Sequence, residues 1–103
     1  MGGWTVAEQA PRWEVNRLAL LSWRSWGDEF VAFEARSGQL VEFDILGAAA
    51  MACLEERPRT TAELAAELAT DLAQPVDAEF TDAVENVVRQ FRRLGWVDAI
   101  IAG

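Results

Sequence analysis

Residues 39–69 read QLVEFDILGAAAMACLEERPRTTAELAAELA, and the spacing of apolar side chains changes within this stretch. From Gln39 to Phe43 the alternation has a period of two, which predicts a short strand. After Phe43 the period is about 3.6, which predicts a helix that Asp44 caps at its N-terminus. The inner face of this helix carries Leu46, Ala50, Cys53 and Leu54. The stretch therefore marks the point where a sheet gives way to helices.

Two further helices are predicted after Pro58, which ends the first one. Thr60 or Thr61 caps the second helix, and Glu63 follows Thr60 at the spacing of a capping box. A break at residues 74–77 precedes the longest helix, expected from about Ala78 to Leu94 with Gly95 as its C-terminal cap. Its buried face is expected to hold Phe80, Val84, Val87, Val88, Phe91 and Leu94.

The segment before residue 39 contains two more predicted strands, at residues 18–23 and at Phe30–Glu34. Residues 24–29 supply the first turn, and residues 35–38 supply a compact loop before the strand Gln39–Phe43. Such short connections favour an antiparallel meander with Gln39–Phe43 at one edge. The predicted fold class is α+β, a winged helix-turn-helix-like arrangement in which a three-stranded antiparallel sheet is followed by three helices.

The domain organisation predicted from these elements is an N-terminal arm at residues 1–15 and a single domain at residues 16–103. Trp4 and Trp13 stand in the polar arm, and we expect their rings to dock on the body of the domain, with contact to a partner as the alternative. After Gly95 the chain packs back through Trp96 and Val97. The last apolar residues form either a short strand or a frayed tail.

Composition argues against an enzyme and against a cofactor. The chain has no histidine, the commonest general base and metal ligand, and all nine of its basic residues are arginines. It has no Gly-rich phosphate loop, and its one cysteine, Cys53, lies among small apolar residues. We therefore expect no metal, nucleotide or flavin to bind, and no catalytic residues.

The net charge of −8 disfavours nucleic acid as a partner, because binding to phosphates depends on cationic side chains. No apolar run approaches the roughly 18 to 20 residues that a membrane span needs, and no secretory signal precedes the domain. The expected setting is the cytoplasm, without membrane association.

Several short motifs occur in an order that resembles the PqqD-like family of peptide chaperones, or RiPP recognition elements. They are WRSWGDEFV at residues 23–31, Ser37-Gly38, Phe43-Asp44 followed by GAAA at 47–50, ERPRT at 56–60 before Ala62-Glu63-Leu64, and Gly95-Trp96-Val97. The best-matching stretch is residues 16–68, and it is most similar to the branch that accompanies an HPr-kinase-related protein. The resemblance implies a module that binds the leader segment of a ribosomally made precursor peptide and presents it to a modifying enzyme.

The resemblance also implies where the leader peptide binds, in a groove between the third strand and the third helix. An exposed strand edge offers unpaired N–H and C=O groups that an extended peptide can satisfy by strand addition. The candidate peptide-binding residues are Gln39, Leu40, Val41, Glu42 and Phe43 on the strand, and Glu85, Val88, Arg89 and Arg92 on the helix.

Other interpretations stay open on the sequence alone. Arg89, Arg92 and Arg93 either pair with carboxylates of a leader peptide or favour the helix macrodipole at its C-terminal end. A winged-helix DNA-binding regulator would use the same arginines on phosphates or guanines. A structural subunit would use the strand edge to pair with itself as a homodimer or to hold an enzyme.

Overall fold

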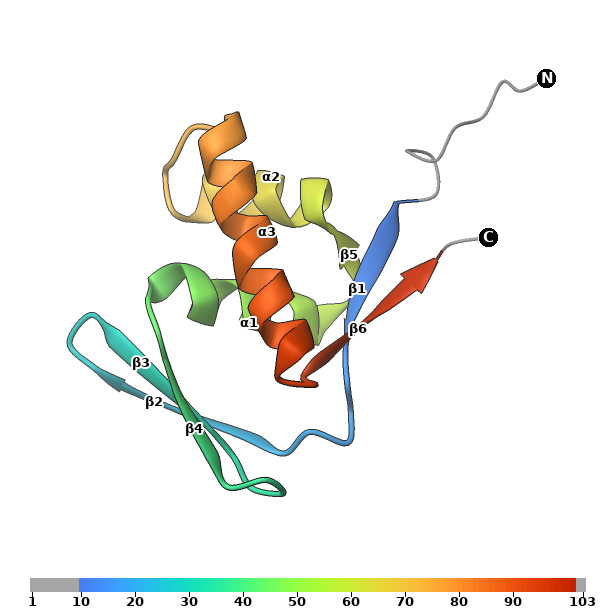
Figure 1. Cartoon of the computed structure of the whole chain (residues 1–103). Coiled ribbons are helices and arrows are strands. Elements are labelled where there is room, and N and C mark those ends of the chain that lie inside the picture. Colours follow the sequence, from blue (N-terminus) through green and yellow to red (C-terminus); the bar gives the residue numbers. More distant parts are fainter. Residues whose placement is uncertain (1–9, 102–103) are drawn as a thin grey trace.

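The computed structural model of the chain describes residues 10–101 and shows an α+β fold with two sheets and three helices (Figure 1). In chain order the elements are β1 (Pro11–Val15), β2 (Leu21–Trp26), β3 (Glu29–Glu34), β4 (Gln39–Phe43), α1 (Ile45–Glu56), β5 (Arg59–Thr60), α2 (Thr61–Asp71), α3 (Ala78–Arg93) and β6 (Val97–Ile101).

The first sheet, called here the meander sheet, has the order β2-β3-β4 and is antiparallel throughout. It precedes the three helices, as the sequence predicted, and β4 is one of its edges. Figure 1 shows it packed beneath α1 and α3. Strand β2 begins later than expected and runs on to Trp26, because Gly27 adopts a positive φ of 59° and closes a tight turn directly before β3.

The second sheet, called here the terminal sheet, has the order β5-β1-β6 and was not expected. Strand β1 pairs antiparallel with β6 along its whole length, from Pro11 opposite Ile101 to Val15 opposite Val97. Residues 11–15 of the expected arm are therefore a central strand. The Trp13 ring docks on the body, with 5% of its surface exposed, and the apolar C-terminal residues form a strand. Trp4 lies outside the described residues.

The helix caps agree with the sequence. The side chain of Asp44 accepts a hydrogen bond from the backbone of Gly47 at 3.0 Å. Thr60 and Glu63 form a complete capping box at the start of α2. Gly95 follows α3 with a positive φ of 82°. Helices α1 and α2 therefore begin, and α3 ends, within a residue or two of the positions that these caps predicted.

Arg59 ties α1 to α2 from a buried position. Its guanidinium donates to the carboxylate of Glu67 and to the backbone carbonyl of Cys53, near the end of α1. The hydrogen bond from Arg59 holds the pKa of Glu67 below its usual range. The contact satisfies both a buried charge and a helix-end carbonyl, so it fixes the angle at which the chain enters α2.

Phe43 joins the meander sheet to the helices. Its ring centroid lies 5.2 Å from that of Phe91 on α3 and 5.5 Å from that of Trp23 on β2. It lies 5.9 Å from the ring of Trp96. Gly47 makes room for it, since a Cβ at that position would lie 2.8 Å from the Phe43 ring. The start of α1 thus fits directly against the end of β4.

This close approach predicts that Gly47→Ala destabilises the protein, although alanine is the better helix former. We expect the free energy of unfolding to fall by about 1 to 3 kcal/mol, the cost of overpacking a core. Urea denaturation measures it. The control is Ala52→Gly at an exposed position of α1, which should cost about 1 kcal/mol through helix propensity alone. A stabilised Gly47→Ala variant would show that the Phe43 ring is free to move away.

Candidate functional site

The candidate site begins at the free edge of β4. On one side β4 pairs with β3, from Phe43 opposite Phe30 to Gln39 opposite Glu34. Within residues 10–101 no strand pairs with its other side. In an antiparallel strand, alternate residues turn their N–H and C=O groups away from the partner. The free edge therefore presents a row of backbone donors and acceptors that the meander sheet does not use.

The side chains of β4 divide between two faces. Val41 and Phe43 face the helices, where Phe43 is buried and Val41 is half-buried. Leu40 and Glu42 face the opposite way, and Leu40 is 67% exposed. Phe43 is one of the five strand residues predicted to bind peptide, but it is mainly a core residue. Only the small exposed part of its side chain lines the neighbouring cavity.

Two cavities lie between β4 and α3, one near each end of the strand, and together they are called here the β4 groove. At one end a cavity of about 420 Å³ is lined by Glu42 and Phe43 of β4 and by Val87 and Gln90 of α3. At the other end a cavity of about 270 Å³ lies beside Gln39 and is closed by the end of α3 and the residues that follow it, Leu94, Gly95 and Trp96. Strand and helix run in opposite directions, so the end of α3 borders the cavity at the start of β4, and Val87 and Gln90 border the cavity at its end.

The two ends of the groove differ in charge. Four acidic residues stand in the lining of the larger cavity: Asp28, Glu29, Glu42 and Asp44. Asp44 caps α1, and none of the four forms an ion pair with a described residue. The smaller cavity at the Gln39 end has both Arg36 and Glu34 in its lining, so opposite charges balance there. A ligand lying along β4 therefore meets one acidic end and one end without an excess of charge.

The helix residues predicted for the groove lie elsewhere. Val88 is fully buried, because it belongs to the core stripe together with Val84 and Phe91. Glu85, Arg89 and Arg92 face β1, where they line a different cavity with Trp13. The flank beside β4 instead carries Val87, Gln90 and Leu94. A helix wheel separates the two flanks of α3 but does not show which flank lies beside β4. The sequence alone therefore could not assign the groove to one flank.

Glu34 fixes the loop that leads into β4. Its buried carboxylate accepts hydrogen bonds from the backbone N–H groups of Leu20 and Ser37, both at 2.8 Å, and of Arg36 at 3.2 Å. These bonds, first that from Leu20, lower the pKa of Glu34 from 4.5 to about 2. The carboxylate stays ionised and holds the β3–β4 loop in place, so the first residue of β4 enters the groove at a fixed point.

Among residues 10–101 no group of three or more His, Cys, Asp or Glu side chains is placed to hold a metal ion. None of the helices described is both long and apolar enough to cross a bilayer.

No protein-family model and no curated protein matches the chain. Among solved structures the chain is similar to TbiB1 in complex with the TbiA(beta) leader peptide, with a TM-score of 0.62. The likeness covers 82% of this chain and 94% of TbiB1, at 13% sequence identity. The chain therefore shares the fold of TbiB1, a protein whose solved structure holds a leader peptide.

The buried carboxylate makes a pH-dependent prediction. Because the pKa of Glu34 is lower in the folded state than in the unfolded chain, its stabilising effect is full above about pH 5 and is lost as the pH falls toward 2. In Glu34→Gln that effect is absent at every pH. The variant should thus melt below the wild type at neutral pH, and the gap in Tm should narrow on acidification.

Thermal melting by circular dichroism from pH 7 to pH 2 measures the gap. The control is Glu42→Gln, which neutralises an exposed carboxylate on the next strand. A gap in Tm that stays constant across this range would contradict a stabilising charge on Glu34.

Proposed function

We propose that this protein captures the leader segment of a ribosomally made precursor peptide by strand addition at β4 and presents it to a modifying enzyme. The observation that carries the proposal is the free edge of β4 beside a groove, in a fold shared with a protein solved in complex with a leader peptide. The motifs that resemble the PqqD-like family support the same function. In this role the protein is a binding module in the cytoplasm and not an enzyme.

In this proposal the backbone of the peptide supplies affinity, and its side chains supply specificity. The backbone of an added strand bonds to the row of N–H and C=O groups on β4, which any extended peptide can use. Every second side chain of that peptide would then point into the groove, toward Val41 and the α3 flank of Val87, Gln90 and Leu94. The acidic end favours a peptide with a basic residue there, so charge would set the direction in which the peptide lies.

The proposal differs in kind from DNA binding by a winged helix. The arginines that such a regulator would use face β1, and one of them stacks on Trp13. Strand addition depends on the backbone ladder, whereas DNA affinity falls steeply with salt. A structural subunit that pairs its β4 edge with a second copy would bind no peptide and would show a concentration-dependent mass.

Synthetic leader peptides encoded by short reading frames beside this gene test the proposal directly. Calorimetric titration should show one peptide bound per chain, with an affinity that changes little between about 50 and 200 mM salt. A scrambled peptide of the same composition is the control. If no such peptide binds, or if duplex DNA binds with a steep salt dependence, leader capture is wrong.

Proline substitution at two adjacent positions tests which backbone groups bind. Of Leu40 and Val41, one turns its N–H toward β3 and the other turns it toward the free edge. Proline removes that donor, so one variant should lose a sheet hydrogen bond and stability, and the other should keep the Tm. We expect the variant that keeps its Tm to bind the leader at least about tenfold more weakly, the loss of one to two backbone bonds. Unchanged affinity in a folded variant would contradict strand addition at β4.

A further inference from the structure

The flank of α3 that faces away from β4 forms a second surface, called here the arginine face. It consists of Arg89, Arg92 and Arg93 on the helix, opposite Pro11 and Trp13 on β1, with Glu85 beside them. Together these residues line a cavity of about 610 Å³, larger than either cavity beside β4. In Figure 1 it corresponds to the side of α3 that is turned toward β1 and β6.

A chain of hydrogen bonds fixes one guanidinium of this face. The indole Nε1 of Trp13 donates to Thr61 Oγ1 at 2.9 Å, and that hydroxyl donates to Glu85 Oε1 at 2.8 Å. The other oxygen of Glu85 accepts from Arg89 Nε at 3.0 Å. The terminal nitrogens of Arg89 have no hydrogen-bond partner among residues 10–101. Arg89 is thus held at one end while its planar fork remains open.

The other two arginines add charge that the described residues do not neutralise. The guanidinium carbon of Arg92 lies 5.7 Å from the centroid of the Trp13 ring, a cation–π distance. Neither Arg92 nor Arg93 forms an ion pair within residues 10–101. Three arginines and a single acidic residue therefore line this cavity, on a chain whose net charge is −8.

We propose that the arginine face is a docking surface for a carboxylate-rich segment of a partner protein. Arginine forks bind carboxylates in a bidentate manner, and the single contact from Arg89 Nε to Glu85 leaves the fork of Arg89 free to pair with a second carboxylate. A carboxylate segment complements the face, whereas the acidic remainder of the surface repels it and so directs it here. The face lies on the opposite flank of α3 from the β4 groove. Both surfaces can be occupied at once, as a protein that delivers a peptide to an enzyme requires.

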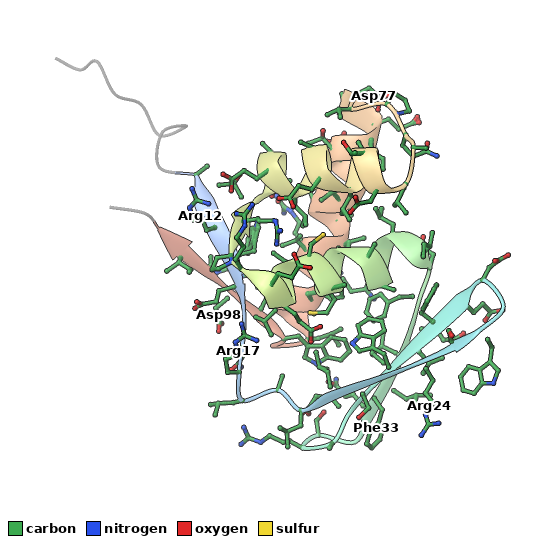
Figure 2. All side chains as sticks on the ribbon, turned by 180° about the vertical axis from the view of Figure 1, so that it is seen from behind. Arg12, Arg17, Arg24, Phe33, Asp77 and Asp98 are labelled. Atoms are coloured by element: carbon green, nitrogen blue, oxygen red, sulfur yellow. The ribbon has the colours of Figure 1, made fainter. Side chains whose placement is uncertain are left out.

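The probe for this proposal is the peptide acetyl-Glu-Leu-Glu-Glu-Phe-Glu-Asp-amide. Its control replaces every acid by the matching amide. All nine basic residues of the protein are arginines, so the Nε–Hε signals of a ¹⁵N spectrum report on each of them separately. On titration with the acidic probe, the signals of Arg89, Arg92 and Arg93 should shift in a saturable manner. The signal of Arg24, on the far face of the meander sheet, should not (Figure 2).

Substitutions make the test quantitative. Arg92→Gln and Arg93→Gln should each weaken the affinity for the acidic probe about fivefold, whereas the matched control Arg24→Gln should leave it unchanged. A leader peptide that binds β4 should keep its affinity in all three variants. A protein that binds the acidic probe but no leader peptide would therefore contradict leader binding at β4 and leave the arginine face supported.

Four results would overturn the proposal. One is an equal shift of all exposed arginines, and another is an equal effect of the amide control peptide. A third is a tighter response of the same signals to a DNA duplex, which would make the face a nucleic-acid surface. The last is a shift that depends on protein concentration without probe, which would make it a contact between two copies of the chain.

Discussion

The packing of Phe43 against three other aromatic rings is the constraint on which the rest of the structure depends. Phe43 is the last residue of β4, and its partners Trp23, Phe91 and Trp96 come from β2, α3 and the residue before β6. The ring therefore sets the distance between the meander sheet and α3. Because interiors are close-packed, that distance is not free to vary, and neither is the width of the groove. The packing of one buried side chain therefore fixes the position of the open edge of β4.

Helix α3 separates two chemically different surfaces. Its buried stripe of Val84, Val88 and Phe91 lies between a flank of uncharged side chains beside β4 and a cationic flank beside β1. One helix can serve both because side chains at successive positions point about 100° apart, so three faces fit around it. The same sixteen residues carry the core and both surfaces.

Local features were predictable from the sequence, and distant pairings were not. The caps at Asp44, Thr60 and Gly95, the edge strand Gln39–Phe43 and the order of a sheet followed by helices all depend on nearby residues, and the structure confirms them. The terminal sheet joins the two ends of the described chain, and no periodicity within a short window reports such a pairing. The flank of α3 that borders β4 stayed open in the sequence for the same reason, because it depends on where β4 and β1 lie relative to the helix.

The pairing of β1 with β6 has a consequence for the order of folding. The hairpins of the meander sheet close loops of a few residues, whereas the terminal sheet must bring together segments from opposite ends of the chain. Loop closure costs more entropy as the loop grows, so local hairpins form readily and the β1–β6 pairing follows later. Trp13 reaches Thr61 and Arg92 from its place in the terminal sheet, where β1 pairs with both β5 and β6. In a nascent or partly opened chain, the strand edge of β4 would therefore form before the arginine face does.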